Sequence, residues 1–418
     1  MAQPKTQQFA FALITSLFFL WGFAHNLDPI LIPHLKRSFT LTTMQATLVD
    51  SAVFIAYFVM ALPAGFITKK FGYKVGIIAG LITFAAGCYL FIPAANTQSY
   101  DFFLFALFII ACGLTLLETT ANPYAAVLGD PETSTQRLNF AQSFNGLAVA
   151  LAPVLGARVI LTKGIPDEAL NRMTEAARAA ALAAEASSVK TPYFILGSVL
   201  LIIALIFVFI KLPEIKNDQT DTASKSIFHA LKHKHLAWGV AAQFFYVGAQ
   251  VCVLSLFILY ATESAMISQV KAADYLGACG AAFLIGRFFS TFLMKYIKGE
   301  NLLTIYALMN VALCTIAILA SGMITVYAII GICFFMSIMF PTIFALGIIN
   351  LKADTEYGSS LLIMSIVGGA ILPRVFGYIS DSTGNIQNGY IVPLLCFIIV
   401  AWFGWKGHKA GQLKEDSI

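Results

Sequence analysis

The chain has 418 residues, of which 59% are hydrophobic and only 11% are charged, against roughly 45–50% and about 25% in ordinary soluble domains. With a mean hydropathy of +0.82, this composition excludes a typical soluble enzyme and predicts a polytopic membrane protein, because an aqueous fold cannot bury so much apolar surface. The formal charge of +5 comes from 26 Lys and Arg against 21 Asp and Glu that lie mostly between apolar runs, so we expect no nucleic-acid partner.

Apolar runs long enough to cross a bilayer, at about 20 residues each, recur along the chain. The first run follows only Lys5, has no small-residue cleavage site and exceeds a signal-peptide core in length, so we interpret it as a membrane helix. The run at 323–350 carries Pro341, which membrane helices tolerate. The predicted fold is an all-α membrane protein of twelve transmembrane helices, at about 9–33, 43–67, 73–94, 101–128, 136–161, 191–211, 236–262, 272–297, 301–321, 323–350, 357–380 and 388–406.

The Lys and Arg residues between the spans predict the orientation in the membrane. An even number of spans places both termini on one side, and placing them inside gives sixteen Lys and Arg in the inner connections against seven in the outer ones. Cytoplasmic connections carry the excess of positive charge. Both termini are therefore expected in the cytoplasm of a bacterium, with the chain in its inner membrane.

Two connections are long and polar. Residues 163–190 are alanine-rich with mixed charge, which favours a short outer helix, with a solvated connector as the simpler interpretation. Residues 212–235 form a predicted cytoplasmic linker between two six-helix halves, 1–211 and 236–418. The alternative for the linker is a contact with lipid headgroups through its basic end, Lys232, His233, Lys234 and His235. Two halves of six helices around a site near the bilayer midplane are the layout of major facilitator transporters.

The sequence carries no constellation typical of an enzyme or a metal centre. The seven cysteines stand singly in apolar stretches, with no CxxC motif and no His at metal-ligand spacing, so neither disulfides nor zinc are expected. A phosphate-binding P-loop and the GxSxG and HExxH motifs are absent from the sequence, which argues against ATP-driven transport and hydrolase chemistry. We expect neither enzymatic activity nor a cofactor.

Three acidic residues fall within predicted spans, where an ionisable group costs at least roughly 2.5–3.5 kcal/mol and indicates a partner, a proton or a water-filled cavity. Glu118, in "LLETTANPY", has no basic residue within several turns of its helix, and burial then favours the neutral acid. Glu118 is predicted to carry the proton or bind substrate, the alternative being a protonated acid in a helix contact. Asp28, with Asn26 and His25 before Pro29, suits sugar hydroxyls or stabilises a kink. Asp50 belongs either to the cavity or to a water-exposed rim.

Carboxamide side chains form two stripes within the predicted spans. Gln142 and Asn145 are three residues apart on one helical face, and Gln243, Tyr246 and Gln250 follow the spacing i, i+3 and i+7. Amides hold neutral polyols through hydrogen-bond donors and acceptors. Both stripes are therefore predicted to bind substrate, with interhelical hydrogen bonding as the alternative.

Two cations also lie within spans. Arg287, in "IGRFFS", is central in its span, where a structural pairing and a functional role are equally compatible with the sequence. Arg374 lies beside Pro373 and is a candidate for the substrate cavity or a gate.

Several motifs carry a resemblance to a known family. The segments "LFFLWGFAHNLDPILIPHLKRSF", "LETTANPYAAVLG", "RLNFAQSFNG" and "SIMFPTIFALGIINLKADTEYGSSLLIMSIVGGAI" resemble the fucose–galactose–glucose:proton symporter family of the major facilitator superfamily, within it most closely the bacterial L-fucose permeases. The resemblance covers nearly all twelve spans. The general facilitator motif after the second span differs, with Lys69 and Lys70 where Asp-Arg is usual.

The resemblance implies proton-coupled import of L-fucose or a related hexose by alternating access, with the proton as coupling ion. By resemblance, Glu118 matches the family's proton-linked glutamate, and Gln142 and Asn145 match its sugar-contacting carboxamides. The family's first-helix "NLND" motif reads Asn26-Leu27-Asp28-Pro29 here, so the carboxylate lies one residue earlier, about 100° around a helix.

Several functional alternatives remain open from the sequence. The substrate could be glucose, galactose or N-acetylglucosamine, and a drug:proton antiporter or a non-transporting sugar sensor are the rival classes. The expected partners are the sugar, the proton and membrane lipid, and a monomer is expected.

Overall fold

The computed structural model describes residues 5–25, 35, 38–39, 48–160, 172–210, 212–213 and 227–411. All regular structure in these ranges is helical, so the predicted all-α class is confirmed. Ten helical stretches there are long and apolar enough to cross a membrane. Each of the twelve predicted spans has helix within it, because one long helix supplies the second and third spans and α6 (Ser134–Ile160) supplies the fifth.

The chain packs as two compact units, of residues 17–121 with 147–212, and of 1–16, 122–146 and 213–418. The predicted boundary at 212–235 between two six-helix halves stays a prediction.

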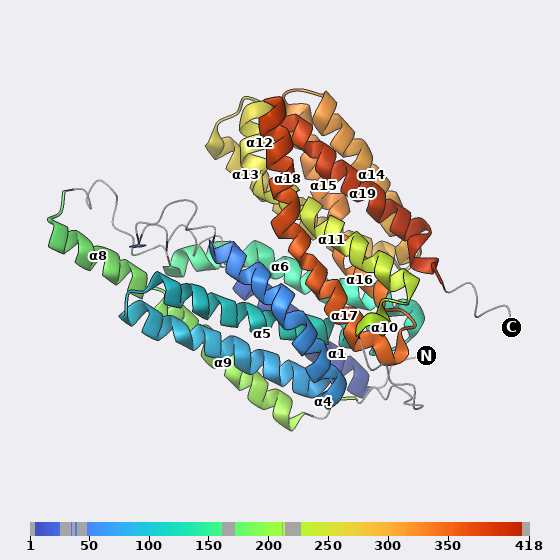
Figure 1. The fold of residues 1–418 in the computed structure, drawn as a ribbon, viewed down its shortest axis with the longest axis horizontal. Helices are drawn as coiled ribbons and strands as arrows, with labels where there is room; N and C mark the ends of the chain where they lie inside the picture. The colour runs from blue at the N-terminus through green and yellow to red at the C-terminus, as the bar shows by residue number, and fades with distance from the viewer. Residues whose placement is uncertain are drawn as a thin grey trace. The chain divides into compact units, whose positions relative to one another are not determined.

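The first unit is built on α1, α4, α5, α6, α8 and α9, of which α1, α5 and α6 also run into the second. In Figure 1, α4 and α9 lie side by side. The helix predicted in the 163–190 connection is present as α8, with the Thr174 hydroxyl accepting a bond from the Ala177 N–H at its start. The bounds are α1 Lys5–His25, α4 Leu48–Asn96, α5 Tyr100–Val127, α6 Ser134–Ile160, α8 Glu175–Ser187 and α9 Lys190–Phe209.

The helix α4 contains two predicted spans with one sharp break between them. The sequence predicts a connection over 68–72, but helical structure continues through Lys69 and Lys70 and is interrupted at Gly72, at φ 83° and ψ 167°. Residues that carry a Cβ atom rarely adopt that backbone conformation, whereas glycine adopts it readily. The reversal of direction between these two spans therefore rests on a glycine.

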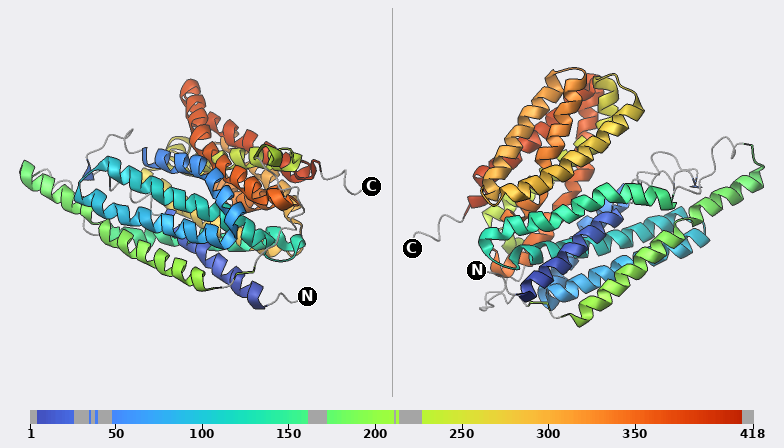
Figure 2. Two further views of the ribbon diagram at one scale, coloured as in Figure 1. Left: turned by 60° about the horizontal axis from the view of Figure 1, so that its bottom comes forward. Right: turned by 180° about the vertical axis from the view of Figure 1, so that it is seen from behind.

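Residues 227–411 of the second unit form a bundle of short and long helices, yellow-green to red in both views of Figure 2. In it α14 packs along α15 and α19, and α11 packs along α16, α18 and α19. The bounds are α10 Ile227–Ala230, α11 Lys234–Ser255, α12 Phe257–Ser264, α13 Gln269–Leu293, α14 Gly299–Leu319, α15 Met323–Met336, α16 Met339–Ile348, α17 Thr355–Met364, α18 Gly368–Thr383 and α19 Ile391–Trp405.

Three predicted spans of this unit are divided helices. The span 236–262 breaks at Leu256, between α11 and α12, and the span 357–380 passes through a 3-10 turn at Ser365–Val367. The span 323–350 breaks at Ser337 and Ile338. Pro341 explains this last break, because it has no N–H to donate to the carbonyl four residues earlier.

Glycines allow α4 and α5 to approach closely. A Cβ atom on Gly113 would overlap the Phe84 backbone nitrogen and lie 2.6 Å from its Cα. These are backbone atoms, which cannot move without moving the helix. The close contact brings α4 and α5 together, and both helices carry residues of the candidate site.

We expect Gly113→Ala to lower the free energy of unfolding by about 1–3 kcal/mol, because the added methyl group overpacks the helix contact. Thermal unfolding in detergent measures the effect. Gly377→Ala in α18 is the matched control, since a Cβ there meets nothing within 4 Å and alanine favours helix. Equal unfolding temperatures for the two variants would contradict the close packing of α4 on α5.

Candidate functional site

The predicted proton-carrying acid lies between α5 and α4. Glu118 is partly exposed, and the hydroxyl of Tyr57 on α4 donates to its Oε1 across 2.7 Å. Tyr57 itself is 4% exposed. A carboxylate held by a neutral phenol can take up or release a proton without breaking an ion pair. Sequence reasoning missed Tyr57, because the register of α4 against α5 has no local signal.

The polar residues around Glu118 bond to three different neighbours. The hydroxyl groups of Thr120 and Thr68 are 2.8 Å apart, linking α5 to α4. One turn later, Asn122 Oδ1 accepts from Gln142 Nε2 across 3.0 Å, and the Tyr124 hydroxyl donates to the Pro213 carbonyl across 3.0 Å. The "LETTANPY" segment therefore fixes α5 against α4, α6 and the start of the linker.

The predicted carboxamides of α6 are differently placed. Gln142 is buried and donates to Asn122, whereas Asn145 is partly exposed. Among the residues that the structure describes, the Nδ2 of Asn122 has no hydrogen-bond acceptor. This amide pair thus retains the NH2 group of Asn122, with two N–H donors that a ligand or a water molecule could use.

The break between α15 and α16 is the second polar centre. It leaves carbonyls that the helix no longer pairs, and two predicted site residues donate to them. The Tyr246 hydroxyl donates to the Met336 carbonyl across 3.0 Å. Arg287 Nε donates to the Ser337 carbonyl across 2.8 Å. In an unbroken helix the N–H of residue 341 would donate to this carbonyl, but proline has no N–H.

Arg287 also joins α13 to α6. Its Nη1 donates to the Gln142 carbonyl across 2.8 Å, and its guanidinium lies 4.6 Å from the centre of the Phe283 ring. The side chain is 4% exposed. Arg287 therefore connects three elements through backbone acceptors and an aromatic face, an arrangement that the sequence left open.

Gln243 is one of the buried amides whose polar atoms a ligand could satisfy. It is fully buried on α11, and neither its Oε1 nor its Nε2 has a partner within the described ranges. A buried polar group without a partner costs about 1–3 kcal/mol. Gln250, two turns later on the same stripe, is partly exposed.

The remaining predicted site residues are less informative. Asn26 and Asp28 lie outside the described residues, and so does the side chain of Asp50, although its backbone belongs to α4. Arg374 is exposed on α18. Their predicted roles stay predictions.

A cavity of about 430 Å³ lies within the second unit, near the start of α6 and the end of α13. Four phenylalanines and two cations line most of it, and none of the predicted sugar-binding residues does. The lining residues are Phe11, Gln136, Arg137, Phe140, Phe288, Thr291, Phe292 and Lys295.

Comparison with known proteins agrees with this architecture. Residues 10–355 match the model of the Major Facilitator Superfamily. The chain is 42% identical to the L-fucose-proton symporter of Escherichia coli over 96% of this chain and 93% of that protein. It is 38% identical to a glucose/galactose transporter of Brucella abortus over 98% of this chain and 96% of that protein.

The fold also matches a solved transporter. A crystal structure of the facilitator-superfamily transporter FucP in the outward conformation superposes with a TM-score of 0.90 at 41% identity, covering 96% of this chain and 99% of that one. The predicted major facilitator fold and the resemblance drawn from the motifs are confirmed.

Proposed function

This chain belongs to the Major Facilitator Superfamily and is a proton-coupled sugar transporter rather than an enzyme, and from that premise we propose that it imports L-fucose or a closely related hexose. The observation that carries the choice of sugar is the 42% identity over 96% of the chain to an L-fucose-proton symporter. In the proposed topology both termini are cytoplasmic, the membrane is the bacterial inner membrane, and the protein acts as a monomer.

The coupling group in this proposal is Glu118. Its partner across 2.7 Å is the neutral hydroxyl of Tyr57. Protonation of Glu118 changes the charge of the site by one unit. Symport requires that the neutral acid favour the sugar-bound form, since a ligand shifts an equilibrium only by its differential affinity for two states. Asp28 is the second proposed coupling acid.

The sugar would be held by amides and hydroxyls rather than by charge. The unpartnered amide of Gln243 and the free Nδ2 donor of Asn122 beside Gln142 support this assignment. Polyol hydroxyls both donate and accept, so they can satisfy such groups. The proposed sugar-binding set is Asn26, Gln142, Asn145, Gln243, Tyr246 and Gln250.

A second substrate class has its own support. The glucose/galactose transporter of Brucella abortus is nearly as similar, at 38% identity. Glucose and galactose are therefore the alternative substrates, with the same coupling mechanism.

The test is uptake of radiolabelled L-fucose into proteoliposomes under an imposed inward proton gradient, challenged with unlabelled hexoses. We expect accumulation that an uncoupler abolishes and that unlabelled fucose competes most strongly. Accumulation of glucose or galactose without fucose would keep the mechanism and replace the substrate. Uptake that an inward proton gradient does not raise would overturn the proposal of proton-coupled import.

A further inference from the structure

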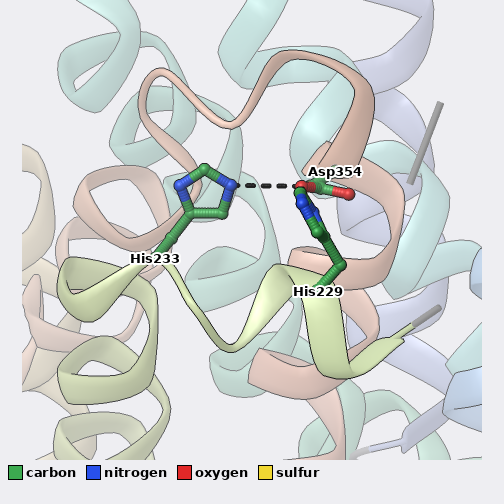
Figure 3. Close-up of side chains that lie close together, drawn as sticks. All are labelled: His229, His233 and Asp354. Atoms are coloured by element: carbon green, nitrogen blue, oxygen red, sulfur yellow. Dashed lines mark hydrogen bonds and ion pairs between the residues drawn. The ribbon is translucent and has the colours of Figure 1, made fainter. Parts of the chain in front are cut away.

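Three side chains far apart in the sequence meet where the linker ends and α17 begins, as Figure 3 shows. His229 Nδ1 lies 2.9 Å from Asp354 Oδ2, and His233 Nε2 lies 3.1 Å from the same oxygen. His229 belongs to α10, His233 precedes α11, and Asp354 precedes the first turn of α17. We propose that His229, His233 and Asp354 form a binding site for a divalent transition-metal ion of the Zn²⁺ class.

The donor set selects the class of ion. Two imidazoles and one carboxylate suit zinc and its neighbours in the first transition row, whereas Ca²⁺ and Mg²⁺ prefer oxygen ligands throughout. Three protein ligands leave a fourth position for water. The site thus resembles neither a cysteine centre nor an all-oxygen calcium loop.

The three ligand atoms lie close enough to converge on one ion after small side-chain rotations. Two atoms each about 2.1 Å from a zinc ion lie about 3.4 Å apart at the tetrahedral angle. The imidazole-to-carboxylate distances here are 2.9 and 3.1 Å, which are hydrogen-bond distances, so the side chains must separate slightly to admit an ion. The three ligand atoms all lie within 4.8 Å of one another. The half-exposed ring of His229 has room to turn toward the ion.

The burial of Asp354 adds an electrostatic argument. Its side chain is 5% exposed, against 50% for His229 and 35% for His233. A buried carboxylate is costly to desolvate, and a cation beside it offsets part of that cost. A divalent cation between the three side chains would add such a charge to the contacts that Asp354 already makes. A protonated imidazole would also supply it, and the experiment separates the two.

The neighbouring backbone holds the three side chains in place. His235 is 3% exposed, and its Nε2 lies 2.9 Å from the Ile349 carbonyl at the end of α16. The chain then turns through Asn350 and Lys352, both at positive φ, and reaches Asp354. Lys232, Lys234 and Lys352 are all exposed. The proposed ion would fasten the end of the linker to the first turn of α17.

The sequence alone indicates two of the three proposed ligands. His229 and His233 are four residues apart, a spacing at which histidines can share a metal, but the third ligand is more than a hundred residues away. The proposal departs from the expectation of no metal site, which rested on the single cysteines and overlooked the spacing of His229 and His233.

The test measures metal binding by the full-length protein in detergent, purified through a tag without histidine and stripped with a chelator. We expect one Zn²⁺ per chain by equilibrium dialysis and a visible absorption spectrum of bound Co²⁺. His229→Ala, His233→Ala and Asp354→Asn should each weaken Co²⁺ binding by at least about tenfold and remove the rise in unfolding temperature that Zn²⁺ produces.

His235→Gln is the matched control, because it removes a neighbouring histidine while glutamine can still donate to the Ile349 carbonyl. It should leave Co²⁺ affinity unchanged. If Asp354→Asn fails to fold, His229→Ala tests the metal site instead. The His229 ring is half exposed, so its removal should leave the fold intact. Unaltered Co²⁺ affinity in His229→Ala and His233→Ala, or no binding of Zn²⁺ and Co²⁺ by the stripped unsubstituted protein, would overturn the proposal and leave a cluster held by hydrogen bonds or a protonated imidazole.

Discussion

Glu118→Gln should abolish proton-driven accumulation of the sugar while leaving exchange of sugar across the membrane. Glutamine keeps the size of the side chain and can still bond to the Tyr57 hydroxyl, which lies 2.7 Å from the carboxylate, but it carries no proton to release. For one proton per sugar, a gradient of one pH unit is worth about 1.4 kcal/mol and drives about tenfold accumulation. In the variant the internal and external sugar concentrations should become equal.

Two assays in proteoliposomes distinguish this outcome. Uptake under an inward proton gradient measures coupling, and counterflow of labelled against unlabelled sugar measures transport alone. Tyr57→Phe is the control, since it removes the hydrogen bond and keeps the acid, so coupled accumulation should persist. Loss of counterflow in Glu118→Gln would refute the role as proton carrier and assign Glu118 to sugar binding or to folding.

Hydropathy predicted the helices because the bilayer imposes one length on every span. It could not predict how the helices bend. The connection expected at 68–72 is a single break at Gly72, since Lys69 and Lys70 lower the hydropathy without ending the helix. Conversely, the apolar sequence around Leu256 gives no sign of the break between α11 and α12.

The candidate site was predictable where a residue conflicts with lipid, and unpredictable where it depends on a partner. Glu118 and Arg287 are conspicuous in apolar runs, but Tyr57 and the Ser337 carbonyl are set by helix register and by the break before Pro341. Tyr246 illustrates the limit. Its place in a polar stripe predicts sugar binding, which stays a prediction, but gave no sign that its hydroxyl donates to the Met336 carbonyl.

Arg287→Met is expected to destabilise the protein more than it alters sugar recognition. Methionine keeps an extended apolar side chain but deprives the carbonyls of Ser337 and Gln142 of their donors. A buried acceptor left without a donor costs about 1–3 kcal/mol, and removal of a desolvated cation offsets part of this. We expect a net loss of about 1–4 kcal/mol in the free energy of unfolding.

Thermal unfolding in detergent and the Michaelis constant for uptake at low temperature measure the two effects separately. Tyr246→Phe is the matched variant, because it removes one donor from the same helix break and should cost about 1 kcal/mol. Arg287→Lys keeps the charge and can restore one of the two bonds, so its stability should lie between those of Arg287→Met and the unsubstituted protein. An unchanged unfolding temperature with a raised Michaelis constant would place Arg287 in the sugar site.

The two bonds of Arg287 differ in what transport demands of them. The bond to Ser337 lies inside the predicted C-terminal half, whereas the bond to Gln142 joins α13 to α6 of the predicted N-terminal half. In the proposed alternating-access cycle the predicted halves rock against each other, which would break the second bond and keep the first. An Arg287→Lys variant that retains only the Ser337 bond should therefore open this contact more readily. The reporter is a cysteine placed at Asn139, whose Nδ2 bonds to Thr342 across the same contact. The accessibility of that cysteine should rise in the Arg287→Lys variant. Labelling of that cysteine at an unchanged rate would show that Arg287 braces the helix break alone.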